Sequence, residues 1–404
     1  MCGIVGYVGD RDCADVLVDA LSKLEYRGYD SAGIAVVEKG VIKVEKCKGR
    51  LANLVDKMAV DGKPQGHCGI GHTRWATHGE PSDINSHPHG NKRVSIVHNG
   101  IIENYKQIKD FLIEEGYSFV SETDTETVAK LLDYYYVDDP VDTIIKVLSE
   151  IKGSYALGIM FRDYPDTVFA VRKECPLIVG VGENENFLAS DVPAIIKYTR
   201  DYYLLEANEI AVVKKDSVQI YDMHKEPVHK EINTADWDVD AAEKGGYEHF
   251  MLKEIHEQPA AVRDTVSPRI INGMPDLSQD GVDMQKLKDY RQIFIVACGT
   301  AMHAGMVGKY VIEKLARKPV IVDIASEFRY RDPIITKDDL MIVISQSGET
   351  ADTMAVLRLA KEVGAATLAV VNVVGSSIAR EADMVIYTPV SYTRLRAHET
   401  RRHL

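Results

Sequence analysis

The 404-residue sequence lacks several features that would assign it to common classes of protein. It has no run of about 18 apolar residues, the length that crosses a bilayer as a helix, so we expect no membrane partner. Its formal charge is −13 rather than positive, which argues against nucleic acid as the main partner. It has neither a Walker A loop nor a GxGxxG stretch, so a nucleotide is not the expected ligand.

Paired cysteines are also missing. The six cysteines are scattered without any CxxC pair, at Cys2, Cys13, Cys47, Cys68, Cys175 and Cys298. The sequence shows no targeting segment ahead of them. We therefore expect reduced thiols in a cytoplasmic protein.

Familiar metal-binding spacings are absent despite a cluster of histidines. Six of them fall between positions 67 and 98: His67, His72, His78, His87, His89 and His98. No pair has the HExxH spacing of a zinc site. We expect no metal and no cofactor, and we assign these histidines to loop shaping and hydrogen bonding.

What the sequence does have begins at position 2. Once Met1 is removed, Cys2 carries both a thiol and a free α-amine, and an α-amine titrates at a pKa of roughly 7.7–8.0. The amine can take the thiol proton near neutral pH, so the nucleophile brings its own base. Residues 3–8 are apolar and β-prone, which places Cys2 directly before a strand rather than in a frayed tail. We therefore predict that Cys2 is catalytic.

The first half of the chain alternates short strands with turns and a few helices. Strands are predicted at 3–8, 33–38, 41–47, 68–72, 94–98, 154–160, 167–171, 177–181, 187–189 and 209–213, and helices at 17–24, 105–115, 125–136 and 141–151. This pattern is typical of a layered α+β fold with largely antiparallel sheets.

Polar residues gather between these strands. Arg74 is suited to a carboxylate and Asp124 to an ammonium group, so the pair fits a small zwitterionic substrate. The Asn99 side chain and the Gly100 backbone N–H are donors of the kind that stabilise an oxyanion. Simpler interpretations are also open. Arg74 is consistent with a surface cation, Asp124 with the start of a helix and Asn99-Gly100 with a tight turn.

These motifs resemble those of the class II (N-terminal nucleophile) glutamine amidotransferases. The resemblance lies in residues 1–6, 26–31, 71–79, 98–100 and 121–126 and extends to about residue 220. It implies an αββα fold without a metal, with Cys2 as nucleophile and Asn99 with Gly100 as the oxyanion hole. It also implies a glutamine site made by Arg74, Trp75, Thr77, His78, His87 and Asp124.

The middle of the chain reads as a connection. Residues 231–244 are acidic and poor in apolar side chains, and Gly245-Gly246 follows, which indicates a linker. A helix is predicted from Phe250, ended by Pro259. We assign residues 221–285 to the linker and joining helices. The segment from Tyr247 to Pro259 also resembles the joining segment of glucosamine-6-phosphate synthases.

The second half changes period. Strands at 293–297, 320–324, 340–344, 367–371 and 384–387 alternate with helices at 303–317, 351–363 and 376–381. This predicts a doubly wound α/β domain with a parallel sheet, in which ligands bind at the carboxyl ends of the strands. Two of those ends are rich in hydroxyls or small polar groups, at 297–301 and 345–350. Such groups before a helix suit a phosphate, although ordinary loop capping gives the same pattern.

The stretch 345–353 resembles the phosphosugar motif of sugar isomerase (SIS) domains. With the other motifs, the chain to about residue 390 is similar to the glutamine–fructose-6-phosphate aminotransferase family. That similarity implies L-glutamine and fructose 6-phosphate as substrates, glucosamine 6-phosphate as product and a homodimer for full-length members. It implies a sugar-phosphate site made by Cys298, Gly299, Thr300, Ser345, Gln346, Ser347 and Thr350. Ala301 departs from the family's usual Ser.

The predicted domains are therefore 2–220 (amidotransferase), 221–285 (joining), 286–390 (first SIS domain) and 391–404 (an aberrant tail). The tail carries four arginines against one acid. We expect that the family's second SIS domain is absent from this chain. We therefore expect glutamine hydrolysis to persist in this chain and full sugar amination to be lost.

Three other functions are consistent with parts of the pattern. One is a different class II amidotransferase, such as an asparagine synthetase or an amidophosphoribosyltransferase. The SIS-type motif and the absence of an ATP loop disfavour both. Another is an SIS enzyme that removes amino-sugar adducts, which lacks an N-terminal Cys domain. The third is a non-catalytic phosphosugar sensor, which glutamine hydrolysis dependent on Cys2 would exclude.

Overall fold

The computed structural model describes residues 2–76, 79–235, 247 and 250–388. The chain divides into two compact units, residues 1–239 and 240–404. Within the described ranges, no helix has the length and hydropathy required to span a bilayer.

The first unit contains two antiparallel sheets. The eight-stranded sheet has the order β14-β11-β9-β10-β1-β4-β2-β3, and the six-stranded sheet has the order β13-β12-β8-β7-β6-β5. The first comprises β1 (Gly3–Gly9), β2 (Ser31–Glu38), β3 (Val41–Lys48), β4 (Cys68–Arg74), β9 (Ile178–Val181), β10 (Glu185–Ala189), β11 (Asp201–Leu204) and β14 (Asn233–Thr234). The second comprises β5 (His89–Gly90), β6 (Val94–Ile102), β7 (Gly153–Phe161), β8 (Thr167–Lys173), β12 (Ile210–Lys214) and β13 (Val218–Tyr221).

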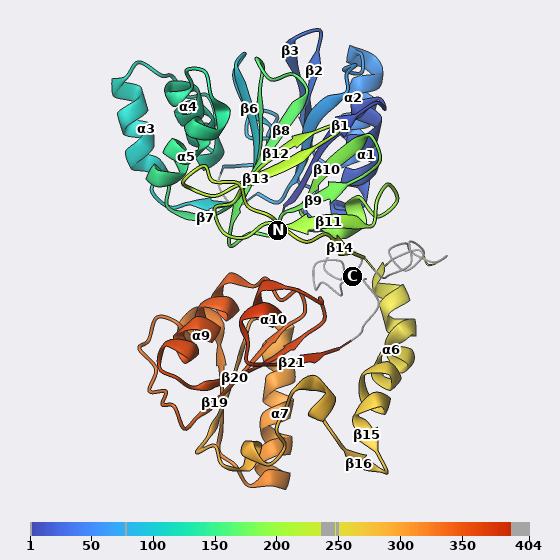
Figure 1. Cartoon of the computed structure of the whole chain (residues 1–404), viewed down its shortest axis with the longest axis vertical. Coiled ribbons are helices and arrows are strands. Elements are labelled where there is room, and N and C mark those ends of the chain that lie inside the picture. Colours follow the sequence, from blue (N-terminus) through green and yellow to red (C-terminus); the bar gives the residue numbers. More distant parts are fainter. Residues whose placement is uncertain (1, 77–78, 236–246, 248–249, 389–404) are drawn as a thin grey trace. The chain divides into compact units, whose positions relative to one another are not determined.

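Alternating side chains on these strands build four layers. On β1, Val5 and Tyr7 pack against α1 (Cys13–Ser22) and α2 (Leu51–Asp61), whereas Ile4 and Val8 pack against the second sheet. The outer face of the second sheet packs on α3 (Tyr105–Glu114), α4 (Asp124–Tyr135) and α5 (Pro140–Glu150). Figure 1 shows these helices on either side of the paired sheets. The αββα arrangement implied by the resemblance is confirmed.

The second unit is built on a parallel sheet with the order β18-β17-β19-β20-β21. Its strands are β17 (Ile293–Ala297), β18 (Val320–Ile324), β19 (Leu340–Ser345), β20 (Ala366–Val371) and β21 (Met384–Tyr387). Its helices are α6 (Phe250–Val266), α7 (Thr300–Ala316), α8 (Ala325–Phe328), α9 (Ala351–Glu362) and α10 (Ser377–Glu381), and a small ladder joins β15 (Ile270–Ile271) to β16 (Met274–Pro275).

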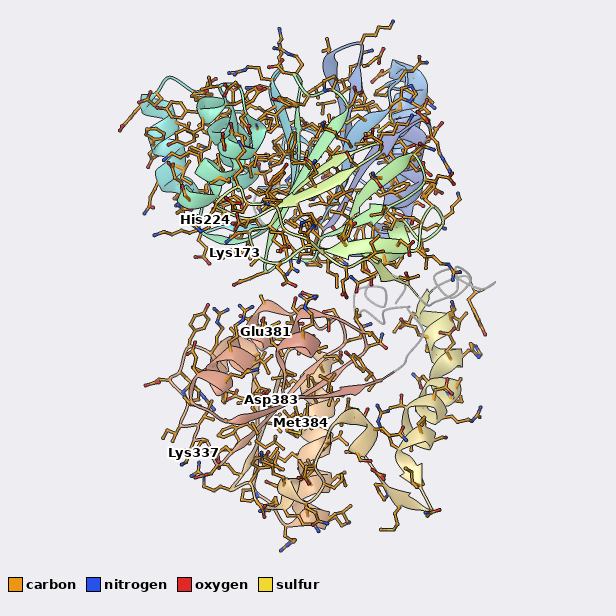
Figure 2. All side chains as sticks on the ribbon, viewed as in Figure 1. Lys173, His224, Lys337, Glu381, Asp383 and Met384 are labelled. Atoms are coloured by element: carbon orange, nitrogen blue, oxygen red, sulfur yellow. The ribbon has the colours of Figure 1, made fainter. Side chains whose placement is uncertain are left out.

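Both faces of this sheet are covered. One face packs on α8, α9 and α10, and the other packs on α7 and the segment around Leu277 and Leu287. At its edge, Asp383 (labelled in Figure 2) accepts hydrogen bonds from the Thr367 backbone and hydroxyl. These bonds tie the start of β21 to the start of β20. The predicted doubly wound α/β domain is therefore confirmed.

The structure corrects two details. Pro259 lies inside α6, which continues to Val266, so it does not end the helix. Asn233 and Thr234, expected in the linker, pair with β11 as strand β14. The rest of the acidic stretch, 236–246, and the predicted aberrant tail 391–404 lie outside the described residues.

Candidate active site

Cys2 lies where β1 begins, beside the end of β4. Gly3 pairs with Thr73 across the two strands, so Cys2 reaches the residues that follow β4. The Cys2 thiol donates to the Trp75 carbonyl at 3.4 Å, and the Trp75 N–H donates to Cys2 Sγ at 3.2 Å. Burial raises the pKa of the Cys2 thiol, while the Trp75 N–H and the charges of Arg74 and Arg27 act in the opposite direction. The thiol therefore needs a base to become a nucleophile.

A glycine makes room for this contact. A Cβ at Gly28 would lie 2.6 Å from the Arg74 backbone carbon and 2.7 Å from the Trp75 nitrogen, closer than real contacts allow. Only glycine therefore lets residues 27–28 lie against the backbone that holds the thiol.

The Cys2 backbone carbonyl is held by two side chains. Arg27 Nε donates to it at 3.0 Å, and Asn99 Nδ2 donates to it at 3.1 Å. Arg27 also forms a 2.9 Å ion pair with Asp191, in which both side chains are buried. The nucleophile is thus fixed through its backbone to a desolvated charge pair.

Asn99 occupies a central position between the sheets. Its Nδ2 donates to the Ser190 hydroxyl at 3.0 Å as well as to the Cys2 carbonyl. Ser190 in turn accepts from the Ile4 N–H at 2.8 Å, which links β1 to the end of β10. Both N–H groups of the amide therefore point toward the Cys2 side, where an oxyanion would form.

Gly100 follows on β6 with a φ of +125°. A Cβ there would collide with the Ser154 carbonyl on the neighbouring strand β7, so the position requires glycine. Among the described residues, no hydrogen bond joins the Gly100 N–H to Cys2, and its oxyanion role stays a prediction.

Arg74 and Asp124 lie in the same buried environment. Burial lowers the pKa of the Arg74 guanidinium, and the nearby charges of Cys2, Asp124 and Asp30 counteract that effect. Arg74 Nη2 donates to the Gly79 carbonyl at 3.3 Å. Asp124 is the first residue of α4, and its Oδ2 accepts from the Ile102 N–H at 2.8 Å. The structure thus brings together a cation and a carboxylate at one end of the sheets.

Three of the clustered histidines pack together in the interior, His72 stacked on His87 and His89 edge-on to His87. The ring centroids of His72 and His87 lie 4.1 Å apart, and those of His87 and His89 lie 4.9 Å apart. His87 Nδ1 accepts from the His98 N–H at 3.3 Å, and its Nε2 lies 3.2 Å from Thr125 Oγ1. Both ring nitrogens of His87 are therefore hydrogen-bonded within the protein. Its role as a glutamine ligand stays a prediction. Across the described residues, no group of three His, Cys, Asp or Glu side chains forms a potential metal site.

Burial should make these histidines sensitive to acid. Desolvation lowers the pKa of His72 to about 3 and holds those of His87 and His89 well below the ordinary value. In the unfolded chain they bind protons near pH 6.5, so the unfolded state gains protons first as pH falls. Each therefore removes about 1 kcal/mol of stability per pH unit below about pH 6.5.

Urea unfolding at pH 7.5, 6.5 and 5.5 tests this expectation. Tryptophan fluorescence isolates the first unit, because both tryptophans, Trp75 and Trp237, lie before residue 240. We expect a steep loss of unfolding free energy below pH 6.5. His89→Gln should make this pH dependence shallower, by the contribution of one fewer proton taken up on unfolding. A flat profile between pH 6.5 and 5.5 would contradict buried neutral imidazoles.

The structure places two predicted catalytic residues together with three of the six predicted glutamine residues. Cys2, Arg74, Trp75, Asn99 and Asp124 share one end of the paired sheets. Thr77 and His78, also predicted to contact glutamine, lie outside the described residues.

Four further residues hold this site and were not predicted as such: Arg27, His72, Ser190 and Asp191. The first two stand inside motifs that carried the resemblance, so their place in the sequence was a signal. Ser190 and Asp191 had no such signal, because only the pairing of β10 with β1 brings them to Cys2.

The second unit presents a separate polar site at the carboxyl ends of β17 and β19, which are adjacent strands. Ser345 Oγ lies 3.0 Å from Thr350 Oγ1 and accepts from the Gly348 N–H at 3.1 Å. The Glu349 N–H donates to Ser347 Oγ at 3.3 Å. This folds residues 345–350 into a tight loop ahead of the 12-residue helix α9.

The other predicted sugar residues line the same edge. The Cys298 side chain lies close to this loop, because its Sγ is 4.0 Å from the hydroxyl of Thr353 in the first turn of α9. Gly299 has a φ of +58° and caps α7, and Thr300, the first residue of that helix, is exposed. Gln346 is also exposed, while its backbone carbonyl accepts from the Asn372 N–H at 3.3 Å. Together they offer hydroxyls and two helix starts to an anion.

A second loop, residues 372–376, and the first turn of α10 lie behind the 345–350 loop. The Ile378 N–H donates to the Gly348 carbonyl at 3.0 Å, and the Ser377 N–H donates to Glu349 Oε1 at 2.8 Å. Gly348 has a φ of +62°, and a Cβ there would collide with Ser376 Oγ. The shape of the 345–350 loop therefore depends on glycine at position 348.

Comparisons with known proteins find a family for each of the two units. Residues 72–197 match the family described as glutamine amidotransferase domain, and residues 286–397 match the SIS domain. The glutamine–fructose-6-phosphate aminotransferase [isomerizing] of Clostridium tetani is 57% identical over 99% of this chain and 67% of its own length. The chain belongs to the glutamine–fructose-6-phosphate aminotransferase family. The enzyme of the same name from Clostridium acetobutylicum is 59% identical over 96% of this chain and 64% of its own length. This member of the family therefore spans about two thirds of these relatives.

Solved structures match the fold. The glutamine phosphoribosylpyrophosphate amidotransferase of B. subtilis aligns with a TM-score of 0.50 at 17% identity, covering 96% of this family member and 90% of that chain. A second structure, titled as the allosteric regulatory enzyme of purine biosynthesis, aligns with a TM-score of 0.51 at 18% identity and covers 92% and 80%. At these identities the likeness supports the N-terminal nucleophile type of fold.

Proposed function

We propose that the first unit hydrolyses L-glutamine to L-glutamate and ammonia with Cys2 as the nucleophile. The observation that carries this is the position of the Cys2 thiol against the Trp75 N–H, with the Asn99 amide 3.1 Å from the Cys2 carbonyl. The α-amine that removal of Met1 would expose takes the thiol proton. Arg74 binds the substrate carboxylate and Asp124 its ammonium group.

The proposed reaction proceeds in two steps. Cys2 Sγ adds to the side-chain amide carbon of glutamine, and its carbonyl oxygen becomes an oxyanion stabilised by Asn99 and Gly100. The C–N bond then breaks, ammonia leaves with the proton taken from the thiol, and a γ-glutamyl thioester remains. Water adds to the thioester and releases glutamate, which restores the thiol.

We further propose that the second unit binds the phosphate of fructose 6-phosphate, and that the ammonia is used to form glucosamine 6-phosphate. The 345–350 loop, the exposed Thr300 and the start of α9 support an anion at this edge. By family likeness the sugar partner is fructose 6-phosphate, the assembly is a homodimer and the location is cytoplasmic. All six cysteines are free thiols, which supports that location.

Separate assays test the two parts. Purified chain is incubated with glutamine, and glutamate and ammonia are measured with and without fructose 6-phosphate. Glucosamine 6-phosphate is measured independently. Absence of glutamate release would reject the proposal for the first unit, and absence of sugar-phosphate binding by calorimetry would reject it for the second.

Gly348→Ala tests the geometry of the sugar-phosphate loop. The substitution forces an alanine into a left-handed conformation against Ser376 and distorts the loop. We expect fructose 6-phosphate binding to weaken about tenfold or more, which corresponds to roughly 1.4 kcal/mol.

Gly364→Ala is the matched control for this substitution. Gly364 also has a positive φ, +78°, but its nearest neighbour is Lys337, and a Cβ there would lie 3.8 Å away from it. Figure 2 shows Lys337 well apart from Glu381, the last residue of α10. Helix α10 begins at Ser377, which contacts the 345–350 loop, so the control site is distant from this region. The control should lower stability without changing sugar-phosphate affinity. Equal loss of affinity in both variants would show that backbone strain alone explains the result.

A further inference from the structure

Asn99 is held on its oxygen side by His72. This histidine lies on β4, and its side chain is fully buried. Its Nε2 lies 3.0 Å from Asn99 Oδ1 and 3.1 Å from the His98 carbonyl oxygen. The contact connects the two sheets, because β4 belongs to the first and β6 to the second.

These partners determine where the proton of the His72 ring lies. A carbonyl oxygen only accepts hydrogen bonds, so the His98 carbonyl requires an N–H at Nε2. The Asn99 oxygen then accepts from the same N–H in a three-centre bond. Nδ1 is buried and has no hydrogen-bond partner in the part of the chain that the structure describes. A neutral ring with its proton on Nε2 therefore satisfies these surroundings.

This proton decides which way the Asn99 amide faces. A primary amide presents an acceptor on one side and two donors on the other. In the observed orientation its donors face the Cys2 carbonyl and the Ser190 hydroxyl. Turning the amide by 180° would place a donor against the His72 N–H and an acceptor against the Cys2 carbonyl. His72 thus favours the orientation that directs N–H groups at the reacting centre.

The ring of His72 is itself fixed. It stacks on His87 with centroids 4.1 Å apart and an interplanar angle of 29°. His87 is anchored at both nitrogens, to the His98 N–H and to Thr125 Oγ1. The N–H that meets Asn99 therefore has little freedom to swing away.

We propose that His72 is a positioning residue for glutamine hydrolysis, which acts by holding the Asn99 amide with its donors toward Cys2. The inference rests on the proposed function of the first unit. Without His72, Asn99 would present its oxygen to the developing oxyanion for part of the time, and the repulsion would raise the barrier to the addition step.

The test compares three substitutions at this position with one control. His72→Phe keeps the stacking and loses the donor, so kcat for glutamate release should fall about 10- to 100-fold with little change in KM. His72→Gln carries an amide nitrogen at nearly the position of Nε2 and should restore most of the rate. His72→Asn has a similar amide on a shorter side chain and should not. The control is His89→Phe. His89 belongs to the same histidine cluster, but its ring contacts Thr123 rather than Asn99, so this substitution should leave kcat within about twofold.

A double-mutant cycle with Asn99→Ala separates positioning from general destabilisation. If His72 acts through Asn99, then His72→Phe has no further effect on kcat in the Asn99→Ala background. An equal loss in both backgrounds, or equal rates for His72→Gln and His72→Asn, would overturn the inference. If His72→Phe does not fold, the comparison of Gln with Asn decides. Absence of glutamate release from the unsubstituted chain would instead reject the proposed function, and the inference with it.

Discussion

Replacing Cys2 by Ala should abolish glutamate release from this protein. The substitution removes the only atom proposed to bond to the substrate, and loss of a nucleophile lowers kcat by about a thousandfold or more. The side chain is half-buried and small, so the free energy of unfolding should change by less than about 1 kcal/mol. Release of glutamate from glutamine, measured with and without the substitution, provides the test.

Cys47→Ala is the matched control for this prediction. Cys47 is a buried thiol on the edge strand β3, away from the Trp75 backbone that holds Cys2. An electrophilic glutamine analogue should label the unsubstituted chain and Cys47→Ala once each, and should leave Cys2→Ala unlabelled. Mass spectrometry also reports whether Met1 is removed, since a retained Met1 leaves no α-amine at Cys2. Glutamate release by Cys2→Ala at the unsubstituted rate would refute the assignment.

Replacing Asp191 by Ala should strongly destabilise the first unit. The Arg27 side chain is 2% exposed and would keep its charge with the Asp191 carboxylate removed. Breaking a buried pair from one side costs about 3–5 kcal/mol, because the remaining charge is left desolvated. Urea unfolding followed by tryptophan fluorescence at pH 7.5 measures the loss.

An exposed ion pair provides the comparison. Lys215 and Asp10 lie 2.6 Å apart, but their side chains are 43% and 69% exposed. Lys215→Ala should change the unfolding free energy by less than about 1 kcal/mol. A loss for Asp191→Ala no larger than that of the control would mean that Arg27 finds enough solvation or other partners without its carboxylate.

The strands and helices with strong periodicity could be predicted from the sequence. The five strands of the parallel sheet were predicted to within one residue at each end, since each is a short apolar run bounded by turn residues. Helix α2, residues Leu51–Asp61, was not predicted, because only Leu51, Leu54 and Met58 are buried along it. Pro259 was misread as a helix end, although the helix continues around it.

The candidate site could be predicted only where local motifs carry it. Cys2, Arg74, Asn99 and Asp124 were assigned from residue chemistry and from the resemblance, and the structure brings them together. Two of the residues that support them, Ser190 and Asp191, could not be predicted in the same way. Ser190 touches the start of β1 because β10 pairs with β1, a contact between positions 186 residues apart. The strand order that produces such contacts has no signature in the spacing of the sequence.

Two successive residues of strand β6, His98 and Asn99, have different roles on opposite faces of the sheet. This restricts insertions and deletions in that strand. His98 points toward α4, where its ring lies 2.9 Å from Thr125 Oγ1, while Asn99 points to the opposite side, toward Cys2. Since side chains alternate with a period of two, deleting or inserting one residue in this strand would exchange the two faces. An imidazole would then stand where the amide is needed. The turn at Lys39 and Gly40 has no such constraint, so length changes should be tolerated in that hairpin and eliminated from β6.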